Sequence, residues 1–164
     1  MAAVDKNQAV IDFLLQCSEL ASNPVFFNFA NAKDDNKQIV TTANEKSLNK
    51  VFLDGSVMKR YTFTIIDFKS VSYNAIPRPI GTTPYQDENV EDFLQVQTII
   101  DWVTEQADVR NYPNFGSDCQ IDDMRVLTEN PALNGVDTTI QPALAKYSVS
   151  IQIDYIDESK KIWR

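Results

Sequence analysis

The strongest constraint on the fold is a run of strand-forming residues, 51–68, with an Asp-Gly pair near its start. Asp54 and Gly55 both tolerate the backbone angles of a two-residue hairpin turn. Beyond this pair, successive side chains must point to opposite faces of a sheet. One face then bears Val57, Tyr61, Phe63 and Ile65, and the other bears Met58, Arg60, Thr62, Thr64 and Ile66. The run predicts a β-hairpin with a long second arm, one side of which faces the core.

The clearest alternation in the chain covers residues 146–157. Its apolar and aromatic residues take one face: Tyr147, Val149, Ile151, Ile153 and Tyr155. Its polar residues take the other: Ser148, Ser150, Gln152 and Asp154. Such a strand is typical of an antiparallel sheet with one face under helices and one face in water. We therefore expect the four polar side chains to point outward.

Two segments have apolar side chains at the three- and four-residue spacing of an amphipathic helix. The first covers residues 4–21, with Asp5 suited to cap its start and Asn23-Pro24 to end it. Its apolar stripe consists of Val10, Phe13, Leu14, Cys17, Leu20 and Ala21. The second covers residues 89–107, with a stripe of Phe93, Val96, Ile100, Val103 and Ala107, widened by Leu94, Ile99 and Trp102. Both stripes are expected to cover the apolar face of the sheet.

The remaining segments are shorter and less regular. We expect strands at residues 25–29, 38–42 and 119–128, and polar loops or turns at 32–37, 43–48 and 111–118. Residues 129–142 contain Asn130-Pro131 and Asn134-Gly135 and are expected to be irregular. The sequence therefore predicts an α+β fold with a mixed, mostly antiparallel sheet packed against two main helices, with extended loops or arms.

A proline-rich segment, residues 76–84, is expected to break regular structure after the hairpin. It contains three prolines and one glycine. Such a segment is extended in advance and loses little entropy when it docks. It is either a plain connector or an arm, at about residues 74–88, that reaches a neighbouring subunit or partner. The residues of that contact would be Ile76, Pro77, Arg78, Pro79 and Ile80.

Composition limits the size of the domain and its partners. A chain of 164 residues is long enough for one ordinary domain, which we expect to cover residues 1–164. Its net charge of −8 disfavours tight binding of nucleic acid, which normally needs clustered lysine and arginine. No signal peptide and no membrane span of about 18 apolar residues is visible, so we expect synthesis in the cytoplasm and no membrane contact.

Few residues offer catalytic or ligand chemistry. The chain has no histidine, which is the commonest general base and metal ligand, and its two cysteines resemble small buried hydrophobes. Acids occur in adjacent pairs such as Asp122-Asp123, whose members point apart on a strand. We expect no catalytic residue, no cofactor and no metal site, and hence no enzyme. A carboxylate-dependent enzyme and a generic cytoplasmic binding domain remain as alternatives.

The order of the expected elements is a helix, a strand with polar loops, a hairpin into a long strand, a proline-rich arm, a helix with Trp102, and two late strands. In this order the chain resembles minor structural proteins of tailed bacteriophages, in particular the tail-terminator and neck proteins. The resemblance covers residues 4–157. It depends most on residues 54–63, 93–103, 121–127 and 145–155.

The resemblance implies a structural virion protein whose sheet is flanked by helices. It implies a homo-oligomeric ring of six subunits that caps the tail tube and joins it to the head-tail connector or stopper protein. DNA would pass through the ring without tight binding. We expect Asp54 and Gly55, with the proline-rich arm, at subunit or partner contacts, and Asp154 and Gln152 facing the lumen. The alternative is another neck or tail component, such as a tail-completion or tail-tube-like subunit.

Overall fold

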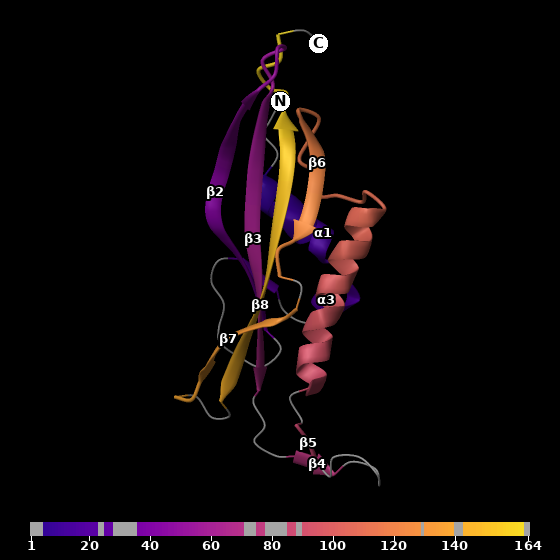
Figure 1. The fold of residues 1–164 in the computed structure, drawn as a ribbon, viewed down its shortest axis with the longest axis vertical. Coiled ribbons are helices and arrows are strands. Elements are labelled where there is room, and N and C mark those ends of the chain that lie inside the picture. The colour runs from indigo at the N-terminus through magenta and orange to yellow at the C-terminus, as the bar shows by residue number, and fades with distance from the viewer. Residues whose placement is uncertain are drawn as a thin grey trace.

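A six-stranded sheet lies at the centre of the fold (Figure 1). Its strands are β1 (Val25–Phe27), β2 (Lys37–Val51), β3 (Val57–Ser70), β6 (Cys119–Val126), β7 (Ala132–Asp137) and β8 (Leu144–Asp157). They lie in the order β1-β2-β3-β8-β6, and β7 pairs with β8 along residues 144–148. Of the described strand pairs in this sheet, the β1–β2 pair is parallel and the others are antiparallel. The expected mixed, mostly antiparallel sheet is confirmed.

The computed structural model describes residues 5–22, 25–27, 36–70, 75–77, 85–87, 90–128, 130–139 and 143–162. Its helices are α1 (Lys6–Leu14), α2 (Ser18–Ala21) and α3 (Val90–Asp108). A separate two-stranded ribbon consists of β4 (Ala75–Pro77) and β5 (Tyr85–Asp87). In Figure 1, α1 lies behind the sheet, α3 runs beside β6, and the ribbon lies at the opposite end from the β2–β3 hairpin.

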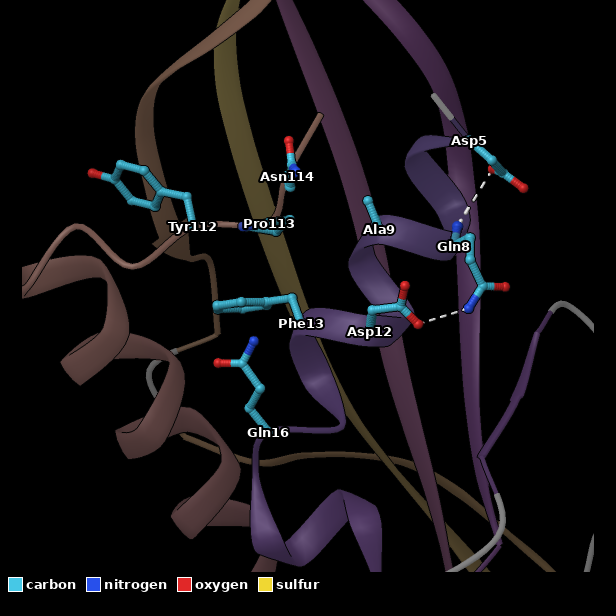
Figure 2. Close-up of a pocket in the computed structure, with 9 residues that line it drawn as sticks. All are labelled: Asp5, Gln8, Ala9, Asp12, Phe13, Gln16, Tyr112, Pro113 and Asn114. Carbon is cyan, nitrogen blue, oxygen red and sulfur yellow. Dashed lines mark hydrogen bonds between the residues drawn. The ribbon is translucent and has the colours of Figure 1, made fainter. Parts of the chain in front are cut away.

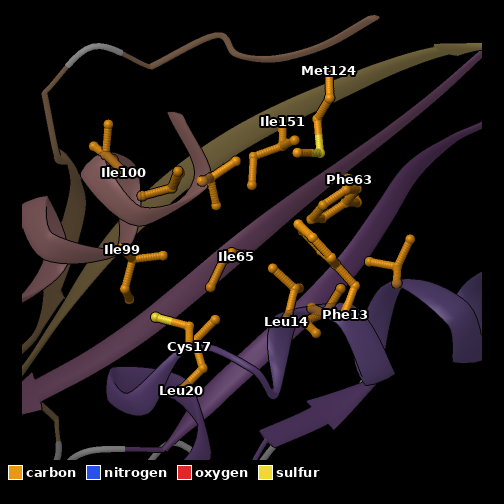
Figure 3. Packing of buried hydrophobic residues seen from close by; sticks show 14 of the residues in the cluster. Phe13, Leu14, Cys17, Leu20, Phe63, Ile65, Ile99, Ile100, Met124 and Ile151 are labelled. Carbon is orange, nitrogen blue, oxygen red and sulfur yellow. The ribbon is translucent and has the colours of Figure 1, made fainter. Parts of the chain in front are cut away.

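One apolar core holds the helices against one face of the sheet (Figure 3). The helices contribute Phe13, Leu14, Cys17, Leu20, Ile99, Ile100 and Val103. The sheet contributes Tyr61, Phe63, Ile65, Met124, Val149, Ile151 and Ile153. The predicted packing of both helical stripes on the apolar faces of β3 and β8 is confirmed. Burial of this much apolar surface is the main force that holds the two layers together.

The predicted β2–β3 hairpin is confirmed, but its connection is longer than expected. The strands are joined by residues 52–56 rather than by Asp54-Gly55 alone. The amide of Phe52 donates to the carbonyl of Ser56 at 2.9 Å, and the Asp54 carboxylate accepts from the amide and hydroxyl of Ser56. Gly55 has a φ of 89°, a conformation that favours glycine. The Asp-Gly pair thus marks the turn without fixing its length.

The first arm of the hairpin is a single strand, β2, where the sequence suggested a strand at residues 38–42 and a loop at 43–48. The predicted loop is wrong. The β2–β3 register shifts three times, between Val40 and Ala43, between Ala43 and Lys46, and between Ser47 and Val51. Each irregularity interrupts the alternation of faces along the strand, so the two-residue period is lost. This explains why β2 could not be recognised from its pattern.

The first predicted helix is two helices, because the backbone of Cys17 is extended, with φ −79° and ψ 123°. Asp5 caps α1 as predicted and accepts from the amides of Asn7 and Gln8. Ala21, assigned to the apolar stripe, is exposed. The second predicted helix is confirmed as α3, but Phe93 and Leu94 are 37% and 55% exposed and do not belong to its buried stripe. The expected helix end at Asn23-Pro24 lies outside the described residues.

Two segments expected to be irregular contain strands. Residues 129–142 include β7, which extends the sheet along β8. The proline-rich segment begins inside β4, where Ile76 pairs with Gln86 and Pro77 with Tyr85. Proline is tolerated there because an edge strand does not need every amide. The expectation of a fully irregular arm is wrong at these two residues, and Arg78, Pro79 and Ile80 lie outside the described residues.

Candidate functional site

The face of the sheet away from the helices carries an ionic network centred on Asp154. Arg60 on β3 makes a two-point contact with this carboxylate, at 2.8 Å from Nε to Oδ1 and 3.1 Å from Nη2 to Oδ2. Arg125 on β6 lies 3.8 Å from Asp154 through Nη2. The hydrogen bond to Asp154 raises the pKa of the Arg60 guanidinium, so the guanidinium stays charged. The network joins three neighbouring strands.

The predicted outward position of the polar residues of β8 needs correction. Asp154, Gln152 and Ser148 lie on the open face, yet each is only 7% exposed. Strand β8 is central, with β3 on one side and β6 or β7 on the other, so longer neighbouring side chains cover its short polar ones. With its amide oriented to satisfy its neighbours, Gln152 accepts from Nη2 of Arg125 at 2.7 Å. The surface therefore presents Arg125, 54% exposed, rather than Asp154.

A second group of charged side chains is buried on the helical side. Lys37, Asp67 and Lys69 are each at most 3% exposed. The Lys37 ammonium lies 3.6 Å from Oδ1 of Asp67, and the Lys69 ammonium lies 3.9 Å from Oδ2. Lys69 also donates to the side-chain oxygen of Gln95 on α3 at 2.7 Å. We call Lys37, Asp67 and Lys69 the buried ionic cluster; through the hydrogen bond from Lys69 to the exposed Gln95 it ties α3 to β2 and β3.

The tip of the β2–β3 hairpin is an exposed apolar surface supported by residues 158–162. Leu53 is 98% exposed, Val51 67% and Ile162 70%. The amide of Ile162 donates to the carbonyl of Asp54 at 2.6 Å, and Lys161 lies 3.6 Å from the Asp54 carboxylate. A Cβ on Gly55 would stand 2.7 Å from the carbonyl oxygen of Lys160, so this approach requires glycine. We call residues 51–56 and 158–162 the hairpin tip.

A groove of about 380 Å³ lies between α3 and β6. Its apolar lining consists of Ile100, Ala107, Met124 and Val126, and its polar lining of Gln97, Asp101, Thr104, Asp108 and Arg125. Asp101 accepts from Gln97 at 3.0 Å, and Asp108 is exposed at the end of the helix. We call this the α3–β6 groove. It offers an apolar floor with carboxylates along one wall.

A hollow of about 400 Å³ lies between α1 and residues 112–114 (Figure 2). Phe13 and Pro113 form its apolar part, while Asp5 and Asp12 are its acids. Both carboxylates serve the helix itself: Asp5 caps α1, and Asp12 accepts from the Gln8 side chain at 2.8 Å. Acids engaged in this way are poorly placed for acid–base work on a ligand.

The predicted site residues lie in three separate places. Asp54 and Gly55 belong to the hairpin tip, whereas Ile76 and Pro77 belong to the β4–β5 ribbon at the other end of the molecule (Figure 1). Asp154 and Gln152 lie within the ionic network of the open face. Sequence reasoning missed the buried ionic cluster, residues 158–162 and the α3–β6 groove. Two sequence features could have pointed to them: Leu53 beside a turn for the hairpin tip, and the lack of any basic residue in α3 for the groove.

Comparison of the chain with protein families and with curated proteins finds no match. Among the described helices, none has the length and apolar character needed to cross a membrane. Within the described ranges, no three acidic, cysteine or histidine side chains lie close enough together to hold a metal ion. Both cysteines are free, and burial raises the pKa of the Cys17 thiol.

Acid sensitivity is expected at the junction between β3 and β8. Burial raises the pKa of Asp157, but hydrogen bonds from Lys59 and Ser159 and the charge of Lys59 outweigh it and lower this pKa from 3.8 to about 2. A lowered folded-state pKa stabilises the protein above pH 3.8, and this contribution disappears as the pH falls toward 2. The variant Asp157→Asn should therefore lose less stability than the wild type on acidification over this window. Urea unfolding at several pH values measures the difference.

The variant Lys59→Met is the matched test, because it removes the cation that contacts Asp157 at 2.7 Å. It should flatten the same part of the pH profile. Identical acid profiles for all three proteins would contradict the role of this pair.

Proposed function

We propose that the protein is a structural subunit of a phage tail, resembling a tail terminator, that closes into a ring at the end of the tail tube. The observation that carries the proposal is the exposed apolar hairpin tip, with Leu53 98% exposed beside Val51 and Ile162. Large apolar side chains exposed together at the tip of one hairpin typically mark a contact with another protein. The mixed sheet with helices on one face is also the architecture that the resemblance implies.

The sheet offers further surfaces for association. In the described part of the chain, β1 pairs with β2 only at residues 37–39, so the outer edge of β2 beyond them has no described partner strand. An edge of unpaired amides and carbonyls is a template for pairing with another chain. A subunit with different contact surfaces at its tip and its flank forms rings when the rotation between copies closes.

The proposed partners are other copies of this chain, the tail-tube protein, and the head-tail connector or stopper protein. DNA would cross the ring in transit. The net charge of −8 per chain suits a conduit, because like charge keeps phosphates from lodging in it. The contact of residues 76–80 with a neighbouring subunit stays a prediction, as does the position of Asp154 and Gln152 near the lumen.

The proposal is tested by the size of the assembly. Mass photometry and electron microscopy of the purified protein, alone and with tail tubes, should give one closed species at about six times the chain mass of 18.6 kDa. A ladder of growing stacks would instead indicate a tube-like subunit. A protein that stays monomeric at high concentration and with tubes present would overturn the proposed function.

A further inference from the structure

Charge is divided unevenly between the helices and the hairpin tip. Helix α3 contains five acidic residues and no basic residue, and residues 5–22 contain three acids and one lysine. These two segments together hold −7 of the net charge of −8. The hairpin tip with Lys50 contains three lysines and two acids. The helical layer and the tip are therefore surfaces of opposite character.

The cations of the tip are available at its surface. Both acids of the tip, Asp54 and Glu158, lie near one lysine, Lys161, at 3.6 and 3.5 Å. Lys50 and Lys160 are exposed, and no described acidic side chain lies within ion-pair distance of either. Lys50 is held over the Phe52 ring at 5.4 Å from its centroid. The tip thus combines exposed apolar side chains with two lysines.

The α3–β6 groove has the complementary chemistry. Its apolar lining consists of the half-buried Ala107 and Val126 together with the buried Ile100 and Met124, and its charged lining consists of Asp101, Asp108 and Arg125. Asp108 stands in the last turn of α3, where no basic residue occurs. Acids at a helix C-terminus are unfavourable because this end carries partial negative charge, and a cation there is stabilising. In the groove lining, Arg125 of β6 is one cation against the two carboxylates Asp101 and Asp108, so a lysine from another copy would balance the remaining negative charge.

We propose that the hairpin tip of one copy docks in the α3–β6 groove of the next copy. This contact rests on the proposed ring function and specifies how neighbouring subunits would meet. In this contact Leu53 lies against Ala107 and Val126, the half-buried apolar lining of the groove, and Lys160 and Lys50 face Asp108 and Asp101. Apolar burial supplies the attraction, and the opposite charges set the orientation.

The positions of the two surfaces fit a contact between unlike faces. In Figure 1 the tip stands at one end of the sheet, whereas α3 and β6 lie along its side. A tip therefore cannot occupy the groove of its own chain, and the contact repeats from copy to copy. The hollow beside α1 is the weaker receptor, because Asp5 and Asp12 already serve their own helix.

Charge reversal with rescue tests the orientation. Lys160→Glu and Asp108→Lys should each weaken ring formation by about tenfold or more, since each sets like charges against each other. The combined variant Lys160→Glu with Asp108→Lys should recover most of the loss. Lys146→Glu is the matched control, because it makes the same change of charge on an exposed lysine outside both surfaces. Circular dichroism confirms that each variant is folded.

Disulfide trapping tests the contact itself. In a Cys119→Ser background, a Leu53→Cys chain mixed with a Thr104→Cys chain should form a covalent pair under mild oxidation. Wild-type rings together with no such pair and no rescue would overturn the tip-in-groove contact and leave the proposed function standing. A covalent pair from a protein that never forms rings would support the tip-in-groove contact and overturn the proposed ring function. Absence of both rings and pairs would overturn both.

Discussion

Replacing Asp67 with alanine is expected to destabilise the protein by about 3–5 kcal/mol, because the substitution removes a buried carboxylate from between two buried ammonium groups. Lys37 and Lys69 flank Asp67 at 3.6 and 3.9 Å, and all three side chains are at most 4% exposed. Removing one partner of such a group costs far more than the group contributes as a whole.

Urea unfolding at neutral pH gives the free energy directly. A domain of this size is typically stable by about 5–15 kcal/mol, so the variant should lose a large part of its stability. The control is Asp123→Ala, which removes a half-exposed carboxylate 3.8 Å from Arg125 and should cost at most about 1 kcal/mol. A similar small loss for both variants would mean that the buried ionic cluster is not a structural requirement.

The sequence predicted well those elements whose pattern depends on nearby residues alone. Strands β3 and β8 pair without interruption from Val57 with Asp157 to Ser70 with Leu144, so their two-residue period survives intact. Helix α3 likewise keeps its spacing over 19 residues. In these elements the side-chain period follows the geometry along the whole length, which is why the residues that form the core face could be assigned.

The errors have a common physical origin in distant parts of the chain. The alternation of β2 is interrupted at three register shifts. These shifts exist only in its pairing with β3 and cannot be seen in the sequence of β2 alone. Asp154 was expected in water because its strand alternates, yet burial also depends on Arg60 and Arg125 from its neighbours. Leu94 was expected in the core, although α3 meets the sheet over a narrower stripe. The position of a strand within the sheet depends on which other segments pair with it, so it cannot be predicted from the side-chain period of that strand alone.

The candidate contact surfaces show the same difference between features set by nearby residues and features set by distant ones. Asp54 and Gly55 could be singled out because turn chemistry is local. They contact residues 158–162, which lie about a hundred positions further along the chain. No local pattern in either segment predicts this contact. The buried ionic cluster likewise joins Lys37 of β2 to Asp67 of β3 and contacts Gln95 of α3 through Lys69. Sequence reasoning found one side of the hairpin-tip contact and missed the buried ionic cluster altogether.

The largest expected effect within the apolar core belongs to Phe63. Its side chain is fully buried, with 0% exposure, in the face of β3 that packs under the helices (Figure 3). It lies beside Tyr61 at 6.1 Å between ring centroids and pairs across the sheet with Ile151. Replacement by alanine removes most of an aromatic side chain from a packed interior, and the surrounding side chains can refill that space only in part.

Phe63→Ala should therefore lower the free energy of unfolding by about 3–5 kcal/mol, measured by urea denaturation. Ile151→Val, at a neighbouring site that is equally buried, should cost only about 0.5–1.5 kcal/mol because a single methyl group is lost. Leu94→Ala provides the surface control: this side chain is 55% exposed on α3, so its removal should change stability by no more than about 0.5 kcal/mol. If Leu94→Ala proved as damaging as Phe63→Ala, Leu94 would have to be buried together with Val96, Ile99, Ile100 and Val103, as the wider stripe expected from the sequence has it. The narrower buried face of α3 would then be wrong.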